Sequence, residues 1–94
     1  MMRKPSFSLE RAALVNLQSA ALTLRSKGPP VEIWWYSVNG GAPQGRSVPV
    51  LIPSDRSALM YVTLFGQERG FQAGRNELRL WTRDGAQYLF VLTF

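Results

Sequence analysis

Short stretches of alternating apolar and polar residues, separated by turn residues, run through most of the chain. Clusters of glycine, proline, asparagine and aspartate recur at 28–30, 39–43, 53–55, 70–74 and 84–85. Between them the alternation predicts four strands, over 31–38, 59–65, 76–82 and 88–94, and a shorter fifth strand over 47–52. Several short strands bounded by turns are typical of an all-β domain.

The same alternation predicts which side chains enter the core. Val31, Ile33 and Trp35 share one face of their strand, and Leu78 and Leu80 share one face of theirs. Over 59–65 the inward set is Met60, Val62 and Leu64. The outward faces then carry aromatic and basic residues: Trp34, Tyr36, Tyr61, Phe65, Arg79, Trp81 and Arg83.

Residues 9–25 fit two alternatives. Leu14, Leu17, Ala21 and Leu24 lie on one helical stripe, and the alanines of this segment favour a helix. Residues 20–25 also alternate as a strand does, and they run directly into a turn and a strand. We favour a strand over 20–25, leave open one N-terminal helix, and expect residues 1–12 to form an N-terminal arm.

The length and composition indicate one globular β-rich domain over residues 1–94. Of the 94 residues, 46% are hydrophobic and 18% are charged. Because so short a chain buries a modest core, we expect a homodimer. No segment approaches the roughly 20 apolar residues of a membrane span. With no cysteine and no signal-peptide pattern, we expect a cytoplasmic protein, in the host cytoplasm if it is viral.

Catalytic chemistry has few candidates in this sequence. The chain has no cysteine, so it has no thiolate ligand for a metal. It also has no histidine, which is the commonest ligand of transition metals and the usual general base. The acidic residues are not spaced as a metal clamp or an acid pair. We therefore expect no enzyme activity, no metal, no cofactor and no small-molecule substrate.

The net positive charge of the chain favours a polyanionic binding partner. Eleven basic residues, nine of them arginine, face six acidic ones, which gives a net charge of +5. The arginine guanidinium forms bidentate hydrogen bonds with phosphate and stacks on bases, and aromatic rings also stack on bases. Basic residues interleaved with aromatics predict binding of single-stranded nucleic acid, DNA or RNA. The predicted contacts are Arg25, Lys27, Trp34, Tyr36, Arg46, Tyr61, Phe65, Arg79, Trp81 and Arg83.

Two segments carry a family resemblance. Residues 25–31, Arg-Ser-Lys-Gly-Pro-Pro-Val, resemble the "Ser-x-Lys-Gly-x-Pro-Tyr" hairpin of the small single-stranded DNA-binding proteins of filamentous phages (the gene V type). Residues 71–75 and the hairpin after them are similar to that family's "Pro-Ala-Gly-x-Tyr" segment. The resemblance implies a dimeric phage protein with a five-stranded OB-like barrel that coats single-stranded DNA. It also implies phosphate contacts for Arg25 and Lys27 and stacking for Trp34 or Tyr36.

A second resemblance leads to a different class. Residues 71–85 also resemble the late strands of immunoglobulin-like sandwiches in bacterial surface and phage structural proteins. That resemblance implies a β-sandwich that serves as a structural or protein-interaction module, such as a virion component, in which the positive charge has no role. The two hypotheses predict different charge placement. Nucleic-acid binding requires the cations and tryptophans on one surface, whereas a structural module allows them to scatter.

Overall fold

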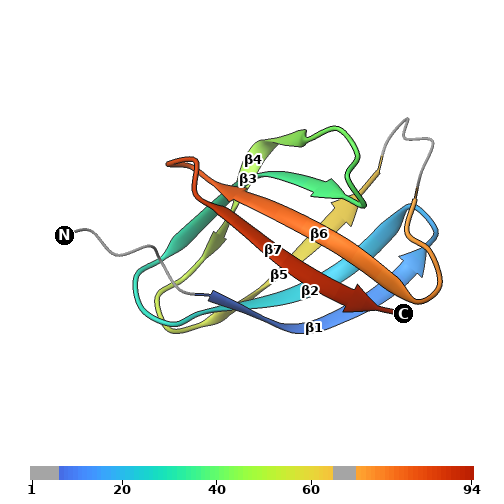
Figure 1. Cartoon of the computed structure of the whole chain (residues 1–94). Helices are drawn as coiled ribbons and strands as arrows, with labels where there is room; N and C mark the ends of the chain where they lie inside the picture. The colour runs from blue at the N-terminus through green and yellow to red at the C-terminus, as the bar shows by residue number, and fades with distance from the viewer. Residues whose placement is uncertain (1–6, 65–69) are drawn as a thin grey trace.

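The computed structural model describes residues 7–64 and 70–94, which fold as two facing sheets (Figure 1). The strands are β1 (Phe7–Asn16), β2 (Ser19–Ser26), β3 (Val31–Val38), β4 (Gln44–Ile52), β5 (Ser57–Thr63), β6 (Arg75–Thr82) and β7 (Gln87–Thr93). No helix occurs in the described ranges, so none of them holds a helix that could cross a membrane.

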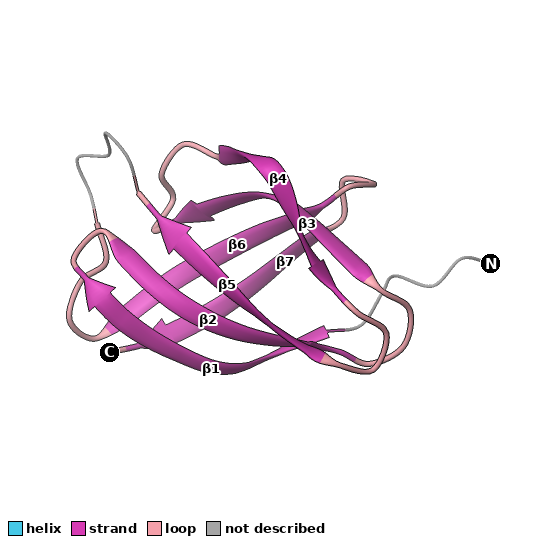
Figure 2. Cartoon of the chain, turned by 180° about the vertical axis from the view of Figure 1, so that it is seen from behind, coloured by secondary structure: helices cyan, strands magenta, loops and turns pink. Residues whose placement is uncertain are grey.

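The strands pair antiparallel in the orders β1-β2-β5 and β4-β3-β6-β7. Figure 1 views the molecule from the four-stranded sheet, and Figure 2 from the three-stranded sheet. Hairpins join β1 to β2, β3 to β4 and β6 to β7, while β2 pairs with β5 and β3 with β6. This is the Greek-key order of an immunoglobulin-like sandwich.

The prediction of an all-β fold is confirmed. The five-stranded OB-like barrel is wrong, because the strands separate into two sheets and β1 adds a strand that was not predicted.

The first third of the chain is a β-hairpin. Ala20, Leu22 and Leu24 of β2 are fully buried, and the strand is held between β1 and β5. The predicted strand over 20–25 is therefore confirmed. The alternative of a helix in this segment is wrong, and residues 7–12 are the first half of β1 instead of an arm. Burial of one face of β2 between two partners outweighs the helical propensity of its alanines.

Alternate residues of both sheets meet in one apolar core. The predicted inward residues Met60, Val62, Leu64, Leu78 and Leu80 are all buried. The turn predicted at 84–85 is confirmed too: it joins β6 to β7, and Gly85 supplies the positive φ of 86° that a tight hairpin needs.

The inner face of β7 covers one side of this core. The Phe7 ring packs against the rings of Tyr88 and Phe90, with centroids 4.2 and 5.5 Å apart. Burial, followed by the negative charge of Asp84, raises the pKa of Tyr88 above its ordinary value. Both effects disfavour the phenolate, so Tyr88 remains neutral in the folded protein at neutral pH.

A β-bulge in β3 overturns part of the predicted facing. The register shifts between Ile33 and Trp35 against both neighbours, β4 and β6. A bulge places two residues opposite one and so inverts the alternation beyond it. Val31 and Ile33 are buried as predicted, but Tyr36 is buried at 5% exposure and Trp35 is exposed at 48%. The prediction that Tyr36 faces solvent and Trp35 the core is wrong for this reason.

Buried Tyr36 ties the two sheets together. Its hydroxyl donates to the carbonyl of Thr63 in β5 at 2.6 Å. We expect Tyr36→Phe to lower the free energy of unfolding by about 1 kcal/mol, because the partly buried Thr63 carbonyl loses that donor. Urea unfolding measures the loss. Tyr61→Phe is the matched control, since Tyr61 is 53% exposed. Equal values for the two variants would contradict a role for the Tyr36 hydroxyl.

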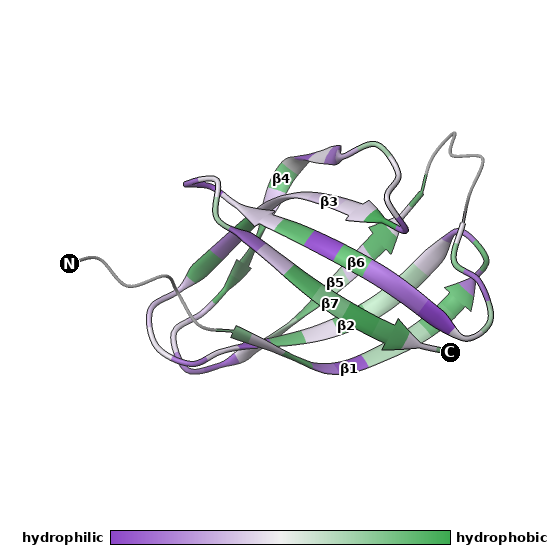
Figure 3. Cartoon of the chain, in the orientation of Figure 1, coloured by the Kyte–Doolittle hydropathy of each residue, from purple (hydrophilic) through white to green (hydrophobic). Residues whose placement is uncertain are grey.

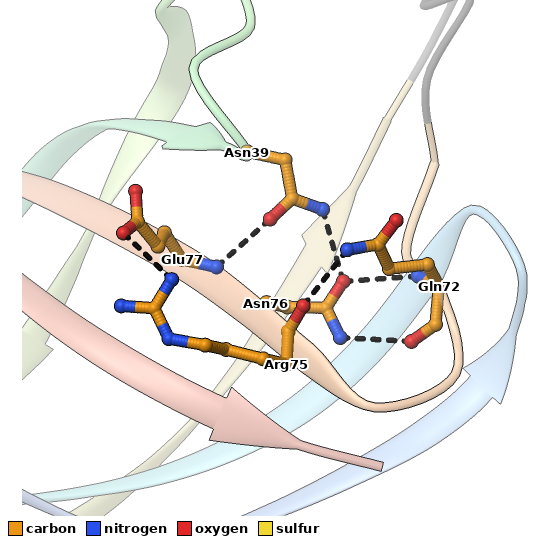
Figure 4. A network of polar contacts seen from close by, with 5 residues as sticks. All are labelled: Asn39, Gln72, Arg75, Asn76 and Glu77. Atoms are coloured by element: carbon orange, nitrogen blue, oxygen red, sulfur yellow. Dashed lines mark hydrogen bonds and ion pairs between the residues drawn. The ribbon is translucent and has the colours of Figure 1, made fainter.

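A polar network closes the end of the sandwich where β3 ends and β6 begins (Figure 4). The side chain of Asn76 is fully buried. Its Oδ1 accepts from the Gln72 amide and from Asn39 Nδ2, each at 2.9 Å. Its Nδ2 donates to the carbonyls of Gln72 at 2.8 Å and Gly74 at 3.1 Å. Asn39 Oδ1 accepts from the Glu77 amide at 2.8 Å. The network fixes residues 72–76 against the end of β3.

Candidate functional site

Three tryptophans gather on the outer surface of the four-stranded sheet. Trp35 of β3 lies directly opposite Trp81 of β6, and both point away from the core. Trp34 Nε1 donates to Glu32 Oε2 at 3.4 Å, which places Trp34 on the same outer side. We call this surface the tryptophan face, and its residues are Glu32, Trp34, Trp35, Arg79, Trp81, Arg83 and Leu89.

The bulge and a glycine together shape the centre of the tryptophan face. The bulge turns Trp35 outward, and its register partner on β4 is Gly45. A Cβ at Gly45 would lie 3.0 Å from the Trp35 ring, so the ring rests on the bare backbone of β4. A larger residue at 45 would push the indole away. Gly45 therefore holds Trp35 close to the sheet while leaving half of the ring exposed.

The charges on this surface are largely balanced. Glu32 Oε2 lies 3.8 Å from the Arg83 guanidinium. Toward the other end of β6, Arg75 and Glu77 form an ion pair at 3.0 Å. Arg79 Nη1 donates to the neutral Gln87 side chain at 3.1 Å. Each ion pair is partly exposed and contributes little to stability, but together they leave Arg79 as the main excess charge beside Trp81.

A shallow groove runs along one side of Trp81. It has a volume of about 300 Å³ and lies between the β3–β4 turn and β7. Gly40, Gly41 and Pro43 form one wall, and the remaining lining comes from Ser37, Glu77, Arg79, Trp81 and Leu89. The groove has an aromatic wall, an aliphatic wall and one charge of each sign. Such a surface suits a mixed apolar and polar partner.

The structure brings only part of the predicted site together. Trp34, Arg79, Trp81 and Arg83 share the tryptophan face. Arg25 and Tyr61 lie on the outer surface of the other sheet, where Arg25 donates to the carbonyl of Asp55 at 3.1 Å. Lys27 is exposed in the β2–β3 loop, Tyr36 is buried, and Phe65 lies outside the described residues.

The side chain of Arg46 donates hydrogen bonds to the backbone of the protein itself. Its Nη1 donates to the carbonyl of Tyr61 in β5 at 3.1 Å, and its Nε donates to the carbonyl of Val48 at 3.2 Å. The bond to Tyr61 joins the edge of one sheet to the edge of the other, and the bond to Val48 lies within β4. The guanidinium is thus occupied by backbone carbonyls instead of being presented to a ligand.

Sequence alternation does not place Trp35 and Leu89 on the tryptophan face. Strict alternation puts Trp35 in the core because it takes no account of the bulge, and β7, apolar on both sides, gives Leu89 no predicted face. The adjacent pair Trp34-Trp35 gives no signal of the bulge, since strict alternation already places one of the two rings outside. Among residues 7–64 and 70–94, no cluster of three or more acidic side chains could hold a metal ion.

Comparison with known proteins identifies a similar fold for this chain but does not assign it to a family. No protein-family model matches the sequence, and no curated protein matches it. Among solved structures, the chain is similar to the archaellum periplasmic stator protein FlaG from Sulfolobus acidocaldarius, with a TM-score of 0.66 and 9% sequence identity. The match covers 95% of this chain and all of that one. At this identity the likeness extends to the β-sandwich fold alone.

Proposed function

We propose that this protein is a non-catalytic interaction module that binds another protein through the tryptophan face. The observation that supports the proposal most is the exposure of apolar side chains there: Trp35 is 48% exposed and Leu89 is 54% exposed, next to Trp81. Tryptophan, with its large apolar area and one polar N–H, is the residue most enriched at the energetic centres of protein interfaces.

The arrangement of charges favours a protein over a polyanion. Phosphate recognition relies on a positive surface, whereas here the carboxylates of Glu32 and Glu77 lie beside Arg83 and Arg75 and lower the local positive potential. Arg25 lies on the opposite sheet, and Arg46 donates to backbone carbonyls. The cations are therefore divided among several surfaces. A nearly neutral aromatic face with a rim of ion pairs resembles the centre and rim of a protein interface.

The structural neighbour is compatible with this class of function. FlaG is described as a stator protein of the archaellum, that is, a stationary part of an assembly. A β-sandwich with an exposed apolar surface can serve in this way without chemistry, since it needs only a rigid scaffold and a docking surface. The proposal for this chain rests on the tryptophan face, and the neighbour supports only the fold that presents it.

Site-specific photo-crosslinking in cells that make this protein tests the proposal. A benzophenone amino acid in place of Trp81 is expected to give one discrete heterologous adduct, because the partner contacts the ring directly. The same probe in place of Leu59 is the control, since Leu59 is exposed on the outer surface of the other sheet, away from the tryptophan face. No adduct at position 81, or the same adducts at both positions, would overturn the proposal.

Single-stranded nucleic acid is the second candidate ligand. The observation that favours it is the position of Arg79, two residues from Trp81 on the outer face of β6. Titration with oligo-dT, followed by tryptophan fluorescence, separates the two candidates. Stacking would quench the fluorescence at low salt, and added salt would relieve the quenching through counterion uptake. The interaction-module proposal predicts no such quenching. Salt-sensitive quenching that Arg79→Ala weakens would replace it with nucleic-acid binding.

A further inference from the structure

The four edge strands differ in how their free edges are protected. Exposed edges invite pairing with another strand unless charge, proline or a bulge prevents it. β1 carries two register irregularities together with Glu10 and Arg11. β4 carries Arg46, Pro49 and a register irregularity against β3.

The edge of β5 is covered by side chains from the opposite sheet. The carbonyls of Tyr61 and Thr63 accept hydrogen bonds from Arg46 and from Tyr36, at 3.1 and 2.6 Å. Both carbonyls face the free edge of β5, so an added strand would have to displace Arg46 or Tyr36 to use them. The third edge is thus occupied over its last residues, although β5 has no charged residue of its own.

β7 has none of these protections. It contains no charged residue and no proline, and its pairing with β6 is regular along its whole length. Figure 3 shows its apolar colouring over most of the strand, beside the alternating colours of β6. Leu89 and Val91 on its outer side are 54% and 51% exposed. Within the described part of the chain, β6 is the only strand that pairs with it.

The hydrogen-bond pattern shows which backbone groups of β7 face its free edge. Gly74 and Phe94 exchange both of their backbone hydrogen bonds, at 2.9 and 3.0 Å, and the Thr82 amide donates to Ala86 at 3.0 Å. In an antiparallel ladder such pairs alternate along the strand. The backbone groups of Phe90 and Leu92 therefore face β6, and those of Leu89, Val91 and Thr93 point away from it.

We infer that β7 pairs antiparallel with β7 of a second copy of this chain, about a two-fold axis at Phe90. In this register Leu89 lies opposite Val91 of the second copy, and Val91 opposite Leu89 of the second copy. These are the residues whose backbone groups face the edge, so the two strands satisfy each other's donors and acceptors. Phe90 meets Phe90 of the second copy on the inner side.

The sequence of β7 favours a second copy of the same strand as the partner of its free edge. The strand is self-complementary, since aliphatic Leu89 meets aliphatic Val91 on both sides of the axis, and without charge no repulsion arises between identical strands. The joined sheet has eight strands and brings the two tryptophan faces onto one continuous surface. This pairing shares Leu89 with the tryptophan face, but it does not depend on the proposed function, because it is formed by the backbone edge of β7 and uses none of the tryptophans.

Sedimentation of the purified chain tests the inference. The wild-type protein is expected to be a dimer at micromolar concentration, and Val91→Pro a monomer. Proline removes the edge-facing N–H of Val91, which β6 does not use, and proline is tolerated on edge strands. Val91→Ala, which keeps the N–H, is the matched control and is expected to remain dimeric. A monomeric wild-type protein, or a dimeric and folded Val91→Pro variant, would overturn the inference.

Cross-linking tests the register without relying on proline. The chain has no cysteine, so Leu89→Cys and Val91→Cys each introduce a single thiol. Mixed and oxidised, the two variants are expected to form a covalent dimer, because directly opposed residues lie about 5.5 Å apart at Cα. Either variant alone is expected not to, since its two thiols are two residues out of register and beyond about 7 Å. Equal cross-linking in all three samples, or none in the mixture, would exclude this register.

Discussion

Replacing Asn76 by alanine is expected to lower the free energy of unfolding by about 3 kcal/mol. The fully buried amide makes four hydrogen bonds, and its removal leaves both backbone groups of Gln72 without these partners. Asn39 Nδ2 also loses its acceptor. The carbonyl of Gly74 loses one donor but still accepts from the Phe94 amide at 3.0 Å. Because small domains are stable by only about 5–15 kcal/mol, a loss of this size is a large fraction of the total.

Urea unfolding at one fixed protein concentration measures this loss, so that any self-association contributes equally to each variant. Gln72→Ala is the control within the same network. The Gln72 side chain is exposed and donates only to the Arg75 carbonyl, so we expect a loss under about 1 kcal/mol. If Asn76→Ala were no more harmful than Gln72→Ala, the Asn76 side chain would not organise residues 72–76.

Replacing Gly70 by alanine is expected to cost a similar amount, about 3 kcal/mol, for a steric reason. A Cβ at Gly70 would lie 2.2 Å from the backbone carbonyl oxygen of Leu17, far inside van der Waals contact. The same oxygen accepts a hydrogen bond from the Phe71 amide at 2.9 Å. The backbone must move to relieve the overlap, and that movement lengthens this bond and displaces buried Phe71. Thermal unfolding should show a lower midpoint.

Gly45→Ala is the matched control, because it makes the same chemical change against a different obstacle. The added methyl group would meet only the Trp35 ring, at 3.0 Å, and a half-exposed ring can swing toward solvent. We expect a loss under about 1 kcal/mol, together with a change in tryptophan fluorescence. If the two glycines proved equally tolerant of alanine, the backbone contact at Leu17 would not constrain residue 70.

Most strands could be predicted from local patterns. β3 has the bounds that were predicted, and β5, β6 and β7 differ from the predicted strands by one or two residues at their ends. The inward faces of β5 and β6 were predicted correctly, because regular strands obey the two-residue alternation. The weakest prediction was over 9–25, where a helical stripe and strand alternation share the same residues and only the sheet partners of β2 decide between them.

The candidate site was predicted less well, for two physical reasons. The bulge in β3 exchanges the environments of Trp35 and Tyr36, and a bulge is set by how a strand meets both its neighbours. Sequence alternation also cannot say which of two sheets a strand joins. For that reason Arg25 and Tyr61 were grouped with Arg79 and Trp81, although they lie on opposite outer surfaces of the sandwich.

Local sequence patterns predict a β-rich chain with tight turns and an excess of arginine, and they leave only residues 9–25 open to a helix. These properties follow from local backbone preferences, side-chain periodicity and composition, which need no knowledge of distant contacts. Three features emerge only from the folded chain: the strands form two sheets, three tryptophans meet on one of these sheets, and β7 has an unprotected edge. Each of these depends on pairing between residues far apart in the chain, and several pairings can satisfy the same local pattern.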